Sequence, residues 1–176
     1  MQTTSTRSLV SLIDHTTATM QLSTVLTKDP AKRTDADDDL LSSYCRRLEY
    51  FQTFSPEALH AIIVPSLQYR RLRINEILIG EKDLKEKEYT GPVYVVLSGI
   101  IEMRIMTPSS RFAIEMLKGD VVGEPHMLRN LPGATYYVTK DVAEVLVIPY
   151  EAMASFNEGL AAKDLEQRVA FLQSAF

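Results

Sequence analysis

The segment between residues 67 and 148 constrains the fold most, because short apolar stretches alternate there with turn residues. The stretches are rich in Val, Ile, Leu and Tyr, and Gly, Pro, Asn, Asp and Ser recur between them. Such spacing is typical of an antiparallel β-sandwich or roll, and not of a parallel sheet with crossover helices. The predicted strands are Leu67–Arg73, Glu76–Ile79, Val93–Leu97, Ile100–Met106, Phe112–Leu117, Tyr136–Thr139 and Glu144–Ile148.

Helical periodicity flanks this segment on both sides. An apolar face with the three-and-four spacing of a helix precedes it, and Ser55-Pro56 resembles an N-cap that opens a second short helix ending near Pro65. A similar stripe follows Pro149. The two stripes consist of Leu40, Leu41, Tyr44, Leu48 and Phe51, and of Leu165, Val169, Leu172 and Phe176. We expect a mainly β fold, an antiparallel β-roll or jelly roll over 67–148, with two N-terminal helices in 41–65 and C-terminal helices in 150–176.

The first forty residues differ in composition from the rest of the chain. They contain no aromatic residue and no glycine, and they are rich in Ser and Thr, so they bury little apolar surface per ordered residue. We predict a polar tail over 1–40 and one folded domain over 41–176. Apolar residues in the tail, among them Leu22, Val25 and Leu26, are expected to order only against a partner or against the domain's own surface.

Charge and hydropathy exclude several classes of protein. The formal net charge of -4 and the pI of about 5.4 give no general attraction to nucleic acid. The longest nearly apolar run, Pro92 to Ile101, is well short of the roughly 20 residues that cross a bilayer, so no membrane insertion is expected. A single cysteine, Cys45, cannot form an internal disulfide. We expect a cytoplasmic protein.

The sequence contains none of the usual catalytic or phosphate-binding motifs. His15, His60 and His126 are far apart, and none has a second His or Cys at metal-ligand spacing. The acidic run from Asp35 to Asp39 is interpreted as solvated rather than metal-binding. We therefore predict no enzyme, no metal and no cofactor, against the alternative of a metal enzyme on a similar roll, in which distant histidines would converge.

The segment from Leu117 to Tyr137 carries the clearest functional signal. A strand is expected to end at Gly119-Asp120, a short helix to open after Gly123-Glu124, and Pro132-Gly133 to lead back into a strand. Backbone N–H groups at a helix start favour an anion, and the Glu124 carboxylate can accept a hydrogen bond from a hydroxyl. A sugar phosphate would match both features.

In these motifs the chain resembles the cyclic nucleotide-binding domain, the β-roll module of cyclic-nucleotide-dependent kinases, ion channels and bacterial transcription regulators. Val122-Gly123-Glu124 and Pro132-Gly133-Ala134-Thr135 resemble the two parts of that family's phosphate-binding cassette. The resemblance covers about residues 41–176 and implies Gly123, Glu124, Gly133, Ala134 and Thr135 as ligand-binding positions. Further matches are Asn75-Glu76-Ile77-Leu78, the strand ending in Ser98-Gly99, and the helical motifs Arg47-Leu48-Glu49-Tyr50-Phe51 and Arg168-Val169-Ala170-Phe171-Leu172.

One departure from the family bears directly on ligand binding. The resemblance places the arginine that pairs with the cyclic phosphate at position 133, where this chain has Gly133. Loss of one member of a desolvated charge pair costs about 3–5 kcal/mol, roughly a hundredfold to a few thousandfold in affinity. Arg129, in the cassette helix, is the first candidate substitute, and Lys118 and Arg111 are weaker ones. The other interpretation of Arg129 is an ordinary exposed arginine.

Two interpretations of function remain open. In the first, the chain is a non-catalytic module with lost or weak nucleotide binding, held by protein partners in a larger assembly; since scaffolding proteins of cilia and flagella contain such rolls, the resemblance suggests a ciliary, flagellar or cytoskeletal setting. In the second, the chain is a sensor of cAMP or cGMP whose terminal helix relays ligand occupancy.

Overall fold

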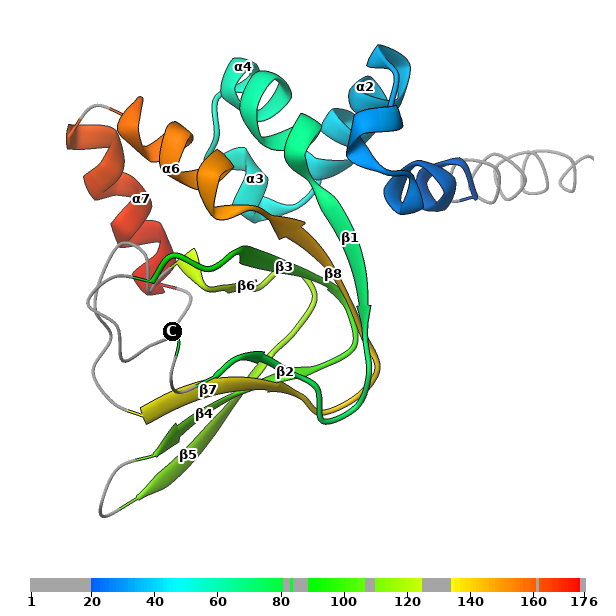
Figure 1. Cartoon of the computed structure of the whole chain (residues 1–176). Coiled ribbons are helices and arrows are strands. Elements are labelled where there is room, and N and C mark those ends of the chain that lie inside the picture. The colour runs from blue at the N-terminus through cyan, green and yellow to red at the C-terminus, as the bar shows by residue number, and fades with distance from the viewer. Residues whose placement is uncertain are drawn as a thin grey trace, which may run out of the picture.

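The chain folds into two antiparallel sheets of four strands each, with helices packed on one of them (Figure 1). The computed structural model describes residues 20–80, 83, 89–106, 110–124, 134–160 and 162–174. The first sheet has the order β1 (Gln68–Leu72), β8 (Ala143–Ile148), β3 (Val93–Ser98) and β6 (Val121–Val122). The second has the order β2 (Ile77–Ile79), β7 (Ala134–Thr139), β4 (Ile101–Met106) and β5 (Arg111–Met116).

The predicted β-roll is confirmed, and each predicted stretch overlaps one strand. Strand β6 was not predicted, because two residues are too few to establish an alternating pattern. It pairs with β3 through Tyr94 and Val95 and extends the first sheet toward Gly123.

The first sheet is covered on both faces. Val93, Val95 and Leu97 of β3 belong to the core beneath the helices, whereas Tyr94 and Val96 belong to the core between the two sheets. This double burial explains why the sequence around β3 is almost continuously apolar and does not alternate.

The N-terminal helical region begins earlier than the predicted boundary at residue 41. Residues 20–27 are helical, η1 (Pro30–Lys32) follows, and α2 runs over Asp35–Cys45. Thr34 and Asp37 form a reciprocal capping box at its start. The acidic run therefore occupies the first helical turn, where carboxylates are favourable.

Part of the predicted tail packs on the domain's own surface. Val25 and Leu26 are buried and join the core beneath the helices. The Ser/Thr-rich composition of the first forty residues hid this apolar face, because only a few residues per turn form it.

Further short helices lead into the roll. The predicted face from Leu40 to Phe51 is divided between α2 and α3 (Glu49–Gln52), because Leu48 is extended. The predicted cap at Ser55 is confirmed: its side chain accepts from the Ala58 N–H at the start of α4 (Pro56–Ala58). The chain continues through η2 (Leu59–Ile63) and η3 (Val64–Ser66) into β1.

Two helices, α6 (Tyr150–Glu158) and α7 (Ala162–Ser174), follow the roll. The predicted apolar stripe of α7 did not include the most buried described residue of that helix. Arg168 is buried and Phe171 packs on the helix-side core, whereas Leu165 and Val169 are only half-buried. The Leu172 side chain and Phe176 lie outside the described residues. In the described part of the chain, no helix has the length and apolarity needed to span a membrane.

Candidate functional site

The candidate site begins where β6 ends, at Gly123 and Glu124. Gly123 has a φ of 102°, a conformation that side chains with a Cβ rarely adopt. A Cβ at this position would lie 2.7 Å from the carbonyl oxygen of Pro92 and 3.2 Å from the ring of Tyr89. Glycine is therefore required for the turn that carries Glu124 into the interior, where its exposed fraction is 0%.

The Glu124 carboxylate lies in a hydrogen-bonded network formed by three separate elements. Tyr50 of α3 donates to its Oε2 at 2.6 Å. Arg168 of α7 donates through Nε to Oε1 at 2.5 Å and through Nη2 to Oε2 at 3.0 Å. Such a two-point contact between guanidinium and carboxylate combines charge neutralisation with fixed geometry. Both oxygens of Glu124 are therefore engaged within the protein.

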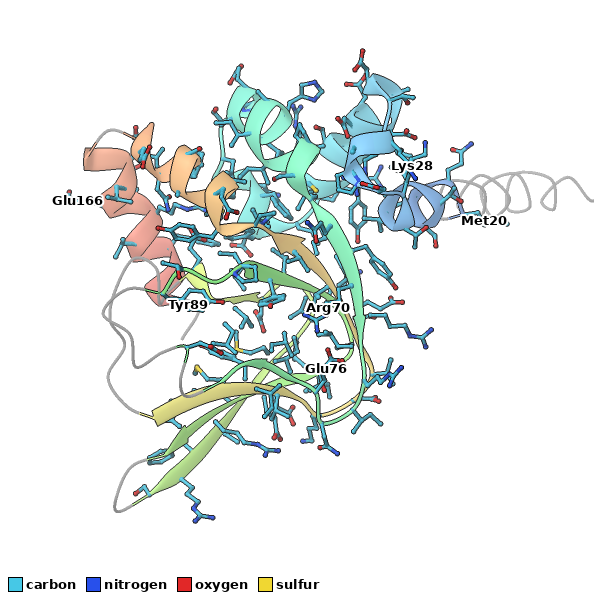
Figure 2. The ribbon with its side chains drawn as sticks, viewed as in Figure 1. Met20, Lys28, Arg70, Glu76, Tyr89 and Glu166 are labelled. Carbon is cyan, nitrogen blue, oxygen red and sulfur yellow. The ribbon has the colours of Figure 1, made fainter. Side chains whose placement is uncertain are left out.

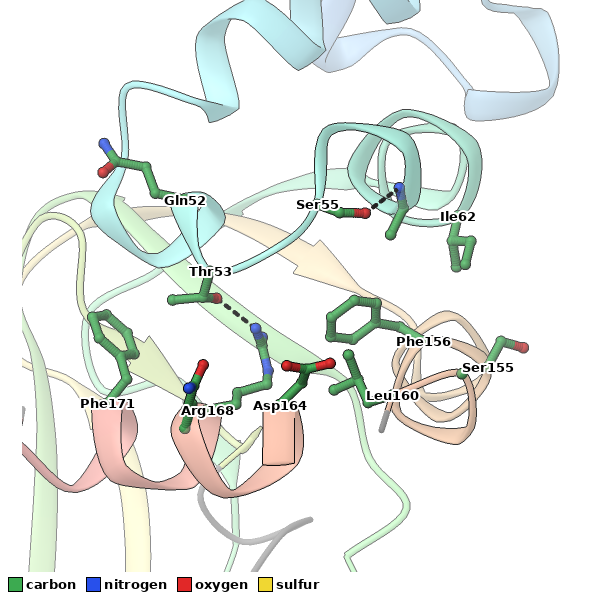
Figure 3. Close-up of a pocket in the computed structure, with 13 residues that line it drawn as sticks. Gln52, Thr53, Ser55, Ile62, Ser155, Phe156, Leu160, Asp164, Arg168 and Phe171 are labelled. Carbon is green, nitrogen blue, oxygen red and sulfur yellow. Dashed lines mark hydrogen bonds between the residues drawn. The ribbon is translucent and has the colours of Figure 1, made fainter. Parts of the chain in front are cut away.

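The remaining groups around Arg168 complete its environment. Its Nη1 donates to the Thr53 hydroxyl at 2.5 Å, a contact drawn in Figure 3. Its Cζ lies 4.0 Å from the centroid of the Phe54 ring and 5.0 Å from that of Phe156, which is within the range of cation–π attraction. We call Tyr50, Thr53, Glu124 and Arg168 the Glu124 network.

The electrostatics of the Glu124 network favour a neutral phenol beside an ion pair. Burial raises the pKa of Tyr50 well above its ordinary value, and the nearby Glu124 charge raises it further, so Tyr50 remains a donor. For Arg168, burial acts to lower the pKa, but the interactions with Tyr50 and Glu124 outweigh it and the net shift is upward. The network is therefore fully charge-compensated and hydrogen-bonded.

The interior of the roll, between the two sheets, is occupied by aromatic side chains next to Gly123. Tyr89, Tyr94 and Tyr137 are all buried in the core that joins the sheets. Tyr89 donates to the Pro92 carbonyl at 2.8 Å, and the Tyr137 hydroxyl lies 3.1 Å from the Met103 sulfur. Tyr137, with no exposed surface, therefore packs in this core and offers no face for stacking a base.

A cation that the sequence analysis missed also faces the roll interior. Arg70 of β1 is in register with Val145, which is in the core between the sheets, and Figure 2 shows Arg70 and Glu76 pointing toward each other there. Their ion pair measures 2.5 Å from Nη2 to Oε1. Strands β1 and β6 are the two edges of the first sheet, so Arg70 of β1 and Glu124, which follows β6, lie at opposite edges of that sheet. The sequence of β1 alone does not show which of its two faces is turned toward the roll interior, so the inward position of Arg70 was not predicted.

The structure places the predicted ligand-binding residues only in part. Gly123 and Glu124 are as described above. Ala134 and Thr135 open β7 in the second sheet, where they pair with β4 at Met106 and Ile105. Arg129 and Gly133 lie outside the described residues. Tyr50 and Arg168 were not predicted as site residues, although both stand in motifs that resemble the family's flanking helices.

Two cavities lie near these residues. One, of about 630 Å³, is lined by α3, α4, α6 and α7 and reaches Arg168, Phe156 and Phe171 (Figure 3). The other, of about 420 Å³, lies beside Arg70 and Tyr94. Within the described residues, no group of three potential metal-ligating side chains is found.

Comparisons with solved structures agree with the architecture. The regulatory domain of Toxoplasma gondii PKA with cAMP aligns with a TM-score of 0.59 and 10% identity, over 79% of this chain and 50% of that one. The sensor domain of the transcriptional regulator DNR from Pseudomonas aeruginosa aligns at 0.57 and 13%, over 78% and 89%. The regulatory subunit of a cAMP-independent protein kinase A from Trypanosoma cruzi, bound to guanosine, aligns at 0.58 and 11%, over 78% and 48%.

The chain thus has the fold of a cyclic nucleotide-binding domain, in a divergent form. It spans about half the length of the two kinase regulatory chains. No family model matches the sequence, and no curated protein matches it.

Proposed function

We propose that this chain is a non-catalytic module that uses the cyclic nucleotide-binding fold as a structural or protein-interaction platform and binds cAMP and cGMP weakly or not at all. The observation that carries the proposal is the state of Glu124. Its carboxylate has no exposed surface, and Arg168 and Tyr50 engage both of its oxygens.

A ribose hydroxyl would have to compete with these internal partners. If Glu124 turned away from Arg168 to meet a ligand, a buried guanidinium would lose its counter-charge, a change that costs about 3–5 kcal/mol. A ligand hydroxyl returns only a fraction of that, because a hydrogen bond to a charged group contributes about 1.5–3 kcal/mol. The glycine at the family's arginine position, an inference from resemblance, weakens phosphate binding in addition.

Packing inside the roll supports the same conclusion. Tyr89 and Tyr137 are buried where the two sheets meet, and the Tyr89 ring lies against Gly123. A nucleotide entering between the sheets near Gly123 would have to displace these rings from an apolar core, which loses favourable burial.

Within this proposal the chain works in a cytoplasmic assembly with protein partners, and a ciliary, flagellar or cytoskeletal assembly is the setting we would test first. The fold neighbours include regulatory parts of larger proteins, which is the support for partner binding. Fractionation of tagged protein between soluble and cytoskeletal pools tests the setting, and recovery in the soluble pool alone would contradict it.

A second candidate is a sensor, and the Glu124 network favours it by linking three elements. A ligand that captured Glu124 would release Arg168 and with it α7, so occupancy would change the position of the terminal helix. The neighbours bound to cAMP and to guanosine show that other proteins with this fold hold such ligands.

Calorimetric titration of the whole chain with cAMP, cGMP and guanosine separates the two candidates. The proposal expects no saturable heat for either cyclic nucleotide at roughly millimolar ligand. It expects none for Gly133→Arg as well, since a restored anion partner leaves Glu124 engaged by Arg168. Ala170→Arg, on the exposed face of α7, is the control for added charge.

Two results would contradict the proposal. Saturable binding of cAMP or cGMP by the unaltered chain at low micromolar concentration would establish the sensor. Binding gained by Gly133→Arg but not by Ala170→Arg would show that only the phosphate partner is missing and that the Glu124 network does not occlude the site.

A further inference from the structure

Strand β5 leaves one edge of the second sheet open. The sheet order places β4 on one side of β5, and among the described residues no strand pairs with its other side, as Figure 1 shows at the margin of the sheet. An open edge offers unpaired backbone N–H and C=O groups to another strand.

The side chains of β5 from Arg111 to Glu115 are exposed, on both faces of the sheet, and only Met116 at its end is buried. Phe112 is 58% exposed and Ile114 is 39% exposed. Their register with Ile105 and Met103 places both on the face that looks toward the roll interior. The opposite face of β5 carries Arg111, Ala113 and Glu115, which are also exposed.

This strand is complementary to itself. If two copies of β5 pair antiparallel about a twofold axis through Ala113, Arg111 lies opposite Glu115 of the second copy, twice. Phe112 then lies opposite Ile114 of the second copy, also twice. Opposite charges and aromatic–aliphatic pairs are the cross-strand combinations that stabilise a sheet, and the central pair of small alanines brings no clash.

We propose that the open edge of β5 is the contact surface for a second copy of this chain, paired in that register. The charge pattern favours this partner and this register, because in other alignments Arg111 and Glu115 do not face each other. An antiparallel shift by two residues would place Arg111 or Glu115 opposite Ala113, and a parallel arrangement would bring like charges together. Among the ion pairs of the described residues, none engages Arg111. Glu115 is paired with Lys140 of its own chain, but its side chain is 47% exposed, so its carboxylate can also accept Arg111 of the second copy.

The contact forms a continuous sheet across two copies but buries little surface. One short strand per copy lies below the size of stable interfaces, so we expect a weak, concentration-dependent dimer. The proposed dimer contact does not depend on whether the roll binds a nucleotide. Strand β5 carries none of the residues of the Glu124 network, and it lies at the opposite edge of the second sheet from β2.

Sedimentation equilibrium of the full chain, from roughly 10 µM to 1 mM, tests the proposal. The unaltered chain should move from monomer to dimer across this range. Arg111→Glu and Glu115→Arg alone should each weaken the dimer by about tenfold or more, because each creates two like-charge pairs. An equimolar mixture of the two variants should recover association, because the heterodimer again pairs opposite charges twice.

Matched controls exclude folding defects and other interfaces. Arg71→Glu reverses an exposed charge on β1, the edge strand of the other sheet, and should associate like the unaltered chain. Phe112→Ser should weaken association without any change of charge, with the far-ultraviolet circular dichroism unchanged. Three results would overturn the proposal. The chain could stay monomeric at 1 mM, in which case the edge of β5 is left for a strand of another protein. The dimer could also be unaffected by the single charge reversals, or the mixture of the two variants could stay monomeric.

Discussion

Replacement of Arg168 by methionine should destabilise the domain strongly and make its stability depend on pH in a new way. The change removes two hydrogen bonds to Glu124, one to Thr53 and a guanidinium 4.0 Å from the Phe54 ring centroid. The Glu124 carboxylate, which has 0% exposure, is left without its cation. Loss of one partner of a buried ion pair costs about 3–5 kcal/mol. For a chain of this length, that corresponds to a fall in Tm of roughly 6–20 °C.

The pH dependence provides the sharper measurement. In the Arg168→Met variant an unpaired buried carboxyl binds its proton more tightly in the folded than in the unfolded chain. The folded variant therefore holds more protons, and its free energy of unfolding should fall as the pH rises from about 5 to 8, relative to the unaltered chain. Urea unfolding at several pH values, followed by circular dichroism and by the fluorescence of the eight tyrosines in a chain without tryptophan, measures this slope.

Removal of both charges is the control. Arg168→Met combined with Glu124→Gln should recover much of the lost stability and remove the new pH dependence, because no buried charge is left unpaired. The reasoning fails if Arg168→Met alone costs less than about 1 kcal/mol, a value typical of exposed ion pairs, and its pH slope matches that of the unaltered chain.

Three further predictions concern other parts of the fold. Tyr50→Phe removes one donor to Glu124 and should lower the free energy of unfolding by about 1–3 kcal/mol in urea titrations, whereas an unchanged midpoint would show that the contact contributes nothing. Gly123→Ala places a Cβ at φ 102° and 2.7 Å from a backbone carbonyl, so it should lower the Tm measured by circular dichroism more than alanine at Gly119, where open space surrounds the Cβ. The pKa of Asp37 is lowered to about 2, by its hydrogen bond from Lys28 first, so its stabilising contribution is present above the ordinary carboxyl pKa and is lost as the pH falls from about 4 to about 2; Asp37→Asn should flatten the acid-unfolding curve in that window, and an identical curve would contradict the assignment.

The sequence was sufficient for the roll because strand signals are local. Each apolar stretch between turn residues became a strand, and the cap at Ser55 formed as predicted. The N-terminal boundary and the strand β6 were not predicted, for a related reason: Val25 and Leu26 gain their burial from helices that follow them in the chain, and β6 is defined by its pairing with β3.

The candidate site likewise has a part that the sequence predicted and a part that it did not. Gly123 and Glu124 could be recognised as a motif in the sequence. The positive φ at position 123 requires glycine, and a carboxylate at position 124 suits hydrogen bonding to a ligand hydroxyl. The apolar stripe predicted for α7 did not include its most buried described residue, Arg168. A charged residue on an apolar face looks exposed until its counter-charge is known.

The amino-acid sequence by itself determined a β-roll with flanking helices, because alternation, turn chemistry and helix caps depend on neighbours within a few residues. Only the tertiary structure decided that Glu124 meets Arg168, 44 residues away, and Tyr50, 74 residues away. The physical reason is that a buried carboxylate must find a cation and donors wherever the topology brings them, and the spacing of residues along the chain does not encode which ones arrive.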